Sequence, residues 1–368
     1  MELDREELLV AVKAANAVTR PDHAVALFTK VWFVDDHVLA FNNASTVISI
    51  PIEVPPLGGV DGRLLAQILD KADDDVIDIE ANETGQAVLK AGRSTIKLGL
   101  TDPTEFVHKV AKPLTGSDQD GAVLEIDTAM LVEEIELDAM LKLKELKTEA
   151  SLDFSSLTVR IETGSKLVLF TSDRQTIART FIKDVEPMDD EAVGRTILIP
   201  LEFMRVLKKL WDSFERGTCT IDNKRIVVSG EDGAILHTTL FTVEQPVDFT
   251  RSIQGLWPTG KINTKLLVPI PEELVEVLAR ACAVIKTTEM DMEFSVVDNV
   301  LTIAATQKGN AFKETLEFEH PNVRVFTRPI LVKDFLKYTD RIYIAPNGLS
   351  LFGPNRFSKF IAGTSRTY

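Results

Sequence analysis

The sequence is poor in cysteine, histidine and aromatic residues, it lacks a long apolar run, and it carries no excess of positive charge. Its two cysteines, Cys219 and Cys282, form no CxxC pair and allow at most one disulfide, which favours a reducing environment. No apolar run reaches the roughly 18 residues of a membrane-spanning helix, and the acidic N-terminal residues lack a signal-peptide core. We therefore expect a cytoplasmic protein with no membrane partner.

The charge balance limits the kind of nucleic-acid contact that the protein makes. The 368 residues include 41 lysines and arginines and 56 aspartates and glutamates, which gives a net charge of −15. A generally basic DNA-binding surface is excluded, because affinity for phosphates comes from lysine and arginine. A local basic stripe is compatible with this balance. At about 150 residues per domain, the length fits two or three domains.

Enzyme and metal signatures are missing from the chain. The sequence has no GxSxG, no GxGxxG and no paired histidines with zinc-ligand spacing. Residues 255–261 fit GxxxxGK, but Ile262 follows where a phosphate-binding loop needs Ser or Thr for magnesium. The acidic runs 73–75 and 189–191 lack the spacing of a calcium loop and are typical of solvated turns. We therefore expect no catalytic residue, no metal and no cofactor.

One pattern returns three times along the chain, namely a helix followed by short strands with alternating apolar residues. These helices begin at Arg63, Leu201 and Ile330, and the strands after the third enclose an Asn347-Gly348 hairpin turn. A further helix precedes each unit, and the three are expected over residues 6–18, 128–141 and 271–285. The repeat predicts an α+β fold of three similar domains, each with two helices packed on antiparallel sheets. We expect these domains over residues 1–117, 118–254 and 255–368.

Basic residues gather on the expected helices or directly after them in all three domains. On the second-domain helix, Lys208 and Lys209 follow Arg205 by three and four residues, so the three share one face. For a single amphipathic helix, a solvated lysine face is the simpler interpretation. Because the pattern recurs, it also fits an acidic protein with a positive lining. The full set is Lys13, Arg20, Lys142, Lys144, Arg205, Lys208, Lys209, Lys333 and Lys337.

Several segments, in a common order, resemble the bacterial DNA polymerase III beta sliding clamp family. The resemblance covers nearly the whole chain, including its length and three-part plan. Residues 89–94 (Leu-Lys-Ala-Gly-Arg-Ser) resemble the family's first-domain "SGRS" strand, and residues 170–178 resemble its "ATDGHRLA" segment. Ile199-Pro200 resembles the "IVP" start of a helix, and residues 245–249 resemble the "FPDY" turn. Each match is weak alone, and the shared order makes the set specific.

The resemblance implies a non-enzymatic processivity clamp. Two copies would close head to tail into a six-domain ring, with helices lining a hole and sheets outside. Such a ring holds double-stranded DNA by topology and tethers a DNA polymerase after a clamp-loader ATPase has placed it on DNA. Weak, sequence-independent attraction from the helix cations would centre the duplex and let it slide. By position, the subunit interface falls on Ile96, Leu98, Val284 and Ile285, although such apolar residues are equally typical of a core.

The resemblance also implies a pocket for a short partner peptide between the second and third domains. The matching positions are Ser172, Arg174, Gln175, Thr176, Ile177, Pro246, Ile361, Gly363, Ser365 and Arg366. The family's Gly-His-Arg-Leu is Arg174-Gln175-Thr176-Ile177 here, and its C-terminal Met-Pro-Met-Arg is residues 363–366. Losing both methionines removes adaptable apolar contacts. A diverged member, such as a bacteriophage clamp tuned to other partners, would show such a departure.

Two other functions fit the same sequence. The first is a clamp-fold interaction module or replication regulator that does not encircle DNA, an alternative that the altered pocket motivates. The second is an enzyme whose site is assembled from distant carboxylates, for which the abundance of aspartate and glutamate is the whole argument. Charge reversal at Arg205, Lys208 and Lys209 separates the first from a clamp, and turnover of any substrate would favour the second.

Overall fold

The computed structural model describes residues 1–42, 46–104, 107, 122–133, 137–141, 152–173, 175–188, 192–284, 291–307, 310–354 and 356–363. Internal contacts divide the chain into two compact units. Unit 1 comprises Met1–Met130, Glu186–Val193 and Ile199–Phe241, and unit 2 comprises Leu131–Val185, Gly194–Leu198 and Thr242–Tyr368. The three domain boundaries expected from the sequence stay a prediction.

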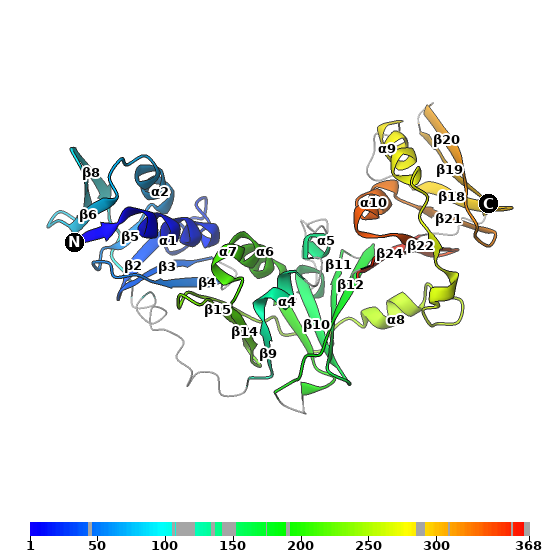
Figure 1. The fold of residues 1–368 in the computed structure, drawn as a ribbon, viewed down its shortest axis with the longest axis horizontal. Helices are drawn as coiled ribbons and strands as arrows, with labels where there is room; N and C mark the ends of the chain where they lie inside the picture. The colour runs from blue at the N-terminus through cyan, green and yellow to red at the C-terminus, as the bar shows by residue number, and fades with distance from the viewer. Residues whose placement is uncertain are drawn as a thin grey trace. The chain divides into compact units, whose positions relative to one another are not determined.

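Unit 1 is built on an eight-stranded antiparallel sheet (Figure 1). Its strands, in spatial order, are β5 (Gly58–Val60), β2 (Val31–Val34), β3 (His37–Phe41), β4 (Val47–Pro51), β16 (Ile235–Thr239), β15 (Arg225–Ser229), β14 (Thr218–Ile221) and β9 (Leu124–Asp127). The pairing of β4 with β16 joins two half-sheets that lie far apart in sequence, with Val47 opposite His237. Apolar residues at both sides of this seam hold the halves together.

Helices cover one face of this sheet. They are α1 (Arg5–Val18), α2 (Gly62–Asp70), α6 (Leu201–Lys209) and the short α7 (Trp211–Phe214). In Figure 1, α1, α7 and α6 lie in a row on that face, and α1 contacts both β3 and α6. Asp4 and Asp61 cap α1 and α2 by accepting backbone N–H hydrogen bonds. These carboxylates fix where each helix begins.

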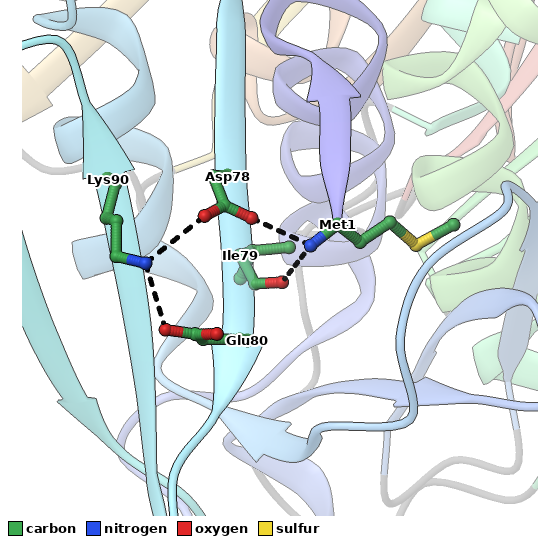
Figure 2. A network of polar contacts seen from close by, with 5 residues as sticks. All are labelled: Met1, Asp78, Ile79, Glu80 and Lys90. Carbon is green, nitrogen blue, oxygen red and sulfur yellow. Dashed lines mark hydrogen bonds and ion pairs between the residues drawn. The ribbon is translucent and has the colours of Figure 1, made fainter.

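A four-stranded sheet completes unit 1, in the order β1 (Glu2–Asp4), β6 (Val76–Ala81), β7 (Gln86–Ala91) and β8 (Ser94–Gly99). Figure 2 shows the polar contacts at its β1 edge. The Met1 amino group donates to Asp78 Oδ1 at 2.7 Å and to the Ile79 carbonyl at 3.2 Å. Lys90 Nζ reaches Asp78 Oδ2 at 3.3 Å and Glu80 Oε1 at 3.1 Å. The opposite edge strand, β8, pairs with β7 on one side and has no partner on its other side among the described residues.

Unit 2 repeats this plan. Its eight-stranded sheet runs in the order β13 (Thr196–Pro200), β10 (Ser156–Glu162), β11 (Lys166–Ser172), β12 (Thr176–Lys183), β24 (Ser358–Ala362), β23 (Gly348–Phe352), β22 (Arg341–Ala345) and β17 (Val268–Pro269). Here β12 pairs with β24 and forms the seam between half-sheets. Its four-stranded sheet has the order β20 (Asn310–Glu317), β19 (Val300–Gln307), β18 (Met292–Val297) and β21 (Val323–Thr327).

Unit 2 has helices of its own. They include α5 (Leu137–Leu141), α8 (Phe249–Gln254), α9 (Leu274–Val284) and α10 (Pro329–Lys333), with 3-10 turns at Leu152–Ser155, Thr264–Leu266 and Leu336–Tyr338. On α9, the expected apolar stripe is buried at Leu274, Leu278 and Ala281. Pro329 begins α10, where its missing N–H leaves no helical hydrogen bond unmade.

The antiparallel α+β fold expected from the sequence is confirmed, with local differences. The helix expected from Ile330 to Tyr338 is α10 followed by a 3-10 turn, which brings Phe335 and Leu336 together into the core. The segment 201–214 is likewise divided into α6 and α7 at Leu210, while its apolar face is buried as expected. In the chain around residues 27–34, only the second half is strand. Residues 26–28 form a 3-10 turn, whose Leu27 carbonyl accepts from Trp32 Nε1 at 3.1 Å.

Candidate functional site

The cations expected to face DNA in unit 1 lie on the helix layer, and three of them are paired with carboxylates. Lys13 Nζ lies 3.0 Å from Asp70 Oδ1, and this hydrogen bond lowers the pKa of Asp70. Arg20, directly after α1, reaches Glu202 Oε1 at 3.2 Å. Arg205 reaches the other oxygen of the same carboxylate at 3.8 Å. The helix layer of unit 1 therefore carries both signs of charge.

The remaining expected cations lie on α6 and in unit 2. Lys208 and Lys209 are exposed in the last turn of α6, where the negative end of the helix dipole stabilises positive charge. In unit 2, Lys333 ends α10 half-buried, and Lys337 Nζ lies 4.5 Å from the centre of the Tyr338 ring. Lys142 and Lys144 lie outside the described residues. The helical placement of the described cations agrees with the sequence, while their contact with DNA stays a prediction.

A tight turn between β11 and β12 organises the expected peptide pocket. Asp173, which is buried, accepts from the backbone N–H groups of Gln175 at 3.1 Å and Thr176 at 2.8 Å. Its same oxygen accepts from Thr176 Oγ1 at 2.8 Å. Ser172 Oγ donates to the Thr176 carbonyl at 2.8 Å. The backbone N–H groups of Gln175 and Thr176 are thus satisfied locally, and Gln175 is exposed.

The structure separates the expected pocket residues into two groups. Ser172, Thr176 and Ile361 are buried. Thr176 and Ile361 lie opposite each other across the β12–β24 seam, and Ser172 lies on β11 opposite Ile177. Gln175, Gly363 and Pro246 line cavities. Ile177 packs against the aromatic cluster described below. Arg174, Ser365 and Arg366 lie outside the described residues.

The first cavity lies where β24 ends, and we call it the β24-end cavity. It has a volume of about 220 Å³ and is lined by Gln175, Asp291, Phe326, Thr327, Arg328, Leu331, Ala362 and Gly363. The backbone N–H of Ala362 donates to the Gln175 carbonyl at 2.8 Å, which fixes the turn against β24. Apolar walls with a few polar groups are typical of peptide sites.

Gly363 explains part of the departure from the family pattern. A Cβ atom at this position would lie 2.4 Å from Val325 Cγ2 and 3.0 Å from the Phe326 carbonyl oxygen. The end of β24 therefore runs too close to β21 for a side chain. A larger residue here would require the two strands to separate, so glycine belongs to the local packing of this chain.

The second cavity lies beside α8, and we call it the α8 cavity. It measures about 240 Å³ and is lined by Thr158, Arg160, Phe170, Gly194, Thr196 and residues 246–250. Asp153 anchors its rim by accepting from the Val247 N–H at 3.0 Å. Phe249 is buried below it, with ring centres 5.7 Å from Phe170 and 6.4 Å from Phe154.

An aromatic cluster therefore underlies the α8 cavity. Its buried members are Val168, Phe170, Phe249, Ile253 and Phe360, with Ile177 and Val247 packed against them. Sequence reasoning missed α8, and treated its first residues as a turn. The available signal was Asp248, which caps the helix by accepting from the Arg251 N–H, followed by Phe249 and Ile253 one turn apart.

The residues expected at a subunit interface lie on outer elements of their units. On edge strand β8, Ile96 is half-buried and Leu98 is buried. On α9, Val284 is 37% exposed, and Ile285 lies outside the described residues. Leu98 therefore belongs to the core of its sheet, while Ile96 and Val284 present apolar surface.

Among the described residues, no group of three or more His, Cys, Asp or Glu side chains is arranged to hold a metal ion. None of the helices in these residues is long and apolar enough to cross a membrane.

The fold of this chain is similar to that of solved structures. No family model and no curated protein matches the sequence. The crystal structure of DNA polymerase III subunit beta from Pseudomonas aeruginosa matches with a TM-score of 0.80 and 15% identity, covering 100% of both chains. The beta chain from Streptococcus pneumoniae matches with a TM-score of 0.80 and 16% identity, over 100% of this chain and 99% of that one.

A third match is the Helicobacter pylori beta clamp bound to a DNA ligase peptide, with a TM-score of 0.75 and 14% identity over 100% of both chains. Identities this low explain why each sequence motif was weak alone, since most positions have changed while the backbone plan has not. The resemblance drawn from the sequence is confirmed as a resemblance of fold. The chain has, over its full length, the fold of the bacterial DNA polymerase III beta sliding clamps.

Proposed function

We propose that this protein is a DNA sliding clamp that encircles duplex DNA and tethers a replicative DNA polymerase. The full-length match to beta clamps, including both eight-stranded sheets, is the observation that carries this proposal. The helix cations Arg205, Lys208 and Lys209 support it, because they give a weak, sequence-independent attraction to phosphates. Because a clamp acts by topology, it needs no catalytic residue. A cytoplasmic location is a further part of this proposal.

The ring requires two copies of the chain. We propose that three domains per copy, over residues 1–117, 118–254 and 255–368, close a six-domain ring through Ile96, Leu98, Val284 and Ile285. A head-to-tail arrangement makes two equivalent interfaces and closes after two copies. The exposed apolar surface of Val284 supports this role. Light scattering at micromolar concentration is expected to give the mass of a dimer, and a monomer would contradict the ring.

Partner proteins are proposed to bind unit 2. The Helicobacter pylori clamp, which shares the fold, holds a DNA ligase peptide. In this chain the β24-end cavity and the α8 cavity are the concave, partly apolar surfaces suited to short peptides of a polymerase or a clamp-loader ATPase. Gln175→Ala and Leu331→Asp are expected to weaken capture of such peptides without changing the oligomeric state.

The decisive experiment compares circular with linear DNA. After loading, the protein is expected to remain on nicked circular DNA through gel filtration, and to be lost once the circle is cut. Reversing Arg205, Lys208 and Lys209 to Glu is expected to lower the amount of protein loaded and the processivity of synthesis, because the cations attract the duplex while topology alone holds a loaded ring. The matched control reverses the exposed Lys183, Lys224 and Lys261, which makes the same change in net charge. Equal retention of linear and circular DNA, or no effect of the first variant, would favour a clamp-fold module that does not encircle DNA.

A further inference from the structure

One carboxylate holds two of the expected DNA-facing arginines. Glu202 lies in the first turn of α6, and its two oxygens reach Arg20 at 3.2 Å and Arg205 at 3.8 Å. Arg20 comes from the segment after α1 and Arg205 from α6, and α1 contacts α6. The side chains are 42%, 37% and 30% exposed for Arg20, Glu202 and Arg205, so solvent and ions reach all three.

The same pattern occurs at a second place in the helix layer of unit 1. Lys13 of α1 pairs with Asp70 at the end of α2 at 3.0 Å, with both side chains more than half exposed. Two separate positions therefore pair a cation of the helix layer with a carboxylate from a neighbouring segment. Their recurrence favours a charge balance of this surface over a single chance contact.

We infer that Glu202 acts as an internal competitor for DNA phosphate, so that duplex contacts Arg20 and Arg205 only by displacing it. The inference rests on the proposed function, because it deepens how the helix layer meets DNA. A carboxylate and a phosphate oxygen make the same charge-assisted hydrogen bonds to guanidinium. Exposed ion pairs of this kind are weak, typically about 0.2–1 kcal/mol, and therefore exchange readily.

This competition has a mechanical consequence for sliding. Each arginine freed by a passing phosphate is recaptured by Glu202 when the phosphate leaves, so no single DNA position is strongly preferred. A surface with unopposed arginines would hold the duplex longer at each step. Glu202 is thus a tuning residue for DNA contact, separate from ring closure and from the partner cavities of unit 2.

The test measures affinity for a short linear duplex by fluorescence anisotropy across a salt series, using the full chain. Glu202→Gln is expected to raise affinity about two- to fivefold at low salt, the range that loss of a weak ion pair allows. The slope of log affinity against log salt should steepen by about 0.9 for each further phosphate contacted. The matched control is Glu231→Gln, which removes the same charge from an exposed pair with Arg216 on another turn of unit 1.

Coupling separates competition from a structural role. Glu202→Gln should raise affinity much less when it is added to Arg205→Gln than when it is added to the wild type, because the competitor acts through the arginine. A lowered melting temperature with unchanged affinity and salt slope would overturn the inference, and so would an equal gain in the Glu231→Gln control. Failure of retention on circles, with the Glu202 effect intact, would instead count against the proposed clamp function.

Discussion

The two eight-stranded sheets share one plan and differ in what they bury at the seam. In both, the fourth and fifth strands in spatial order join half-sheets, β4 with β16 in unit 1 and β12 with β24 in unit 2. The fifth strand carries a basic residue in each case, the half-buried His237 in β16 and the fully buried Lys359 in β24. Burial lowers the pKa of His237 to about 4 and that of Lys359 to about 7. In both strands, therefore, burial disfavours the protonated form of a basic side chain, an imidazole in one and an amine in the other.

The surroundings of these two residues explain the difference. His237 lies opposite Val47, which belongs to a buried hydrophobic cluster with Trp32 and Phe41. Lys359 is fully buried, its Nζ lies 4.1 Å from the centre of the Phe335 ring, and it has no hydrogen-bond partner among the described residues. The Phe335 face and the charge of Asp173 offset part of its desolvation. The comparison teaches that a buried lysine is tolerated where an aromatic face and a carboxylate lie near it, whereas burial and the charge of Arg225 both favour the neutral form of His237.

The largest expected effect tests whether the units are independent. Phe249→Ala removes a ring from the aromatic cluster of unit 2 and should lower the free energy of unfolding by about 3–5 kcal/mol. Hydrogen exchange should then quicken in β11, β12 and β24 and stay unchanged in β2–β4. Phe41→Ala is the matched change in unit 1 and should give the reverse pattern. Uniform loss of protection in both units, from either variant, would remove the comparison.

A second prediction concerns Lys359. Since its pKa is about 7 in the folded protein and near 10.5 when unfolded, the unfolded chain binds more protons between these values. Stability should therefore rise from pH 7 to pH 10.5 and fall again as the pH is lowered. Lys359→Met should raise the free energy of unfolding at pH 7 by on the order of 3 kcal/mol and remove this rise. The exposed Lys183→Met serves as control, and an unchanged pH profile in Lys359→Met would contradict the assignment.

The unit 1 seam should respond in a lower pH window. His237 has a pKa of about 4 in the fold and 6.5 as its ordinary value, because burial, helped by Arg225, disfavours the charged ring. Stability is thus complete above pH 6.5 and is lost as the pH falls to 4. His237→Gln should remove on the order of 2 kcal/mol of this loss in acid urea titrations, with His37→Gln as control. If both variants keep the wild-type acid sensitivity, another group is responsible.

The smallest expected effect compares hydrogen bonds at the seams. Ser358 Oγ accepts from Arg179 Nε at 3.2 Å, and burial lowers the pKa of Arg179 to about 10. Ser358→Ala should cost about 1–2 kcal/mol, because a half-buried cation loses an acceptor. Thr46 and Thr238 meet at 3.5 Å across the other seam, so Thr46→Val should cost no more than about 0.5 kcal/mol. Equal costs in thermal unfolding would show that Arg179 is solvated despite its burial.

Local patterns were sufficient for most helices and many strands. The 3.6-residue stripe of α6 and the period-two strands of residues 218–241 were read correctly because their apolar faces are continuous in sequence. The strands β12, β20 and β21 and the helix α8 were missed. In β12, burial alternates while apolar residues do not, because the buried positions include Thr176 and Thr180 as well as Ala178 and Ile182.

The peptide pocket stays a prediction. The sequence placed Gln175, Pro246 and Gly363 together through a resemblance, whereas the structure puts Gln175 and Gly363 at the β24-end cavity and Pro246 at the α8 cavity. It also named Ser172, Thr176 and Ile361, which prove to be buried. Neither Arg328 nor the central Asp173 was identified, because hydrogen bonds of a turn and the walls of a cavity are contacts between distant segments.

The sequence by itself determined the α+β class, the recurrence of helix and strands, and the concentration of lysine and arginine on helices, since these depend on residue spacing within one segment. The tertiary structure decided which half-sheets join at β4–β16 and β12–β24, and that one carboxylate, Glu202, restrains two arginines. Pairing across such long separations depends on which apolar faces bury each other, and no local pattern encodes that choice.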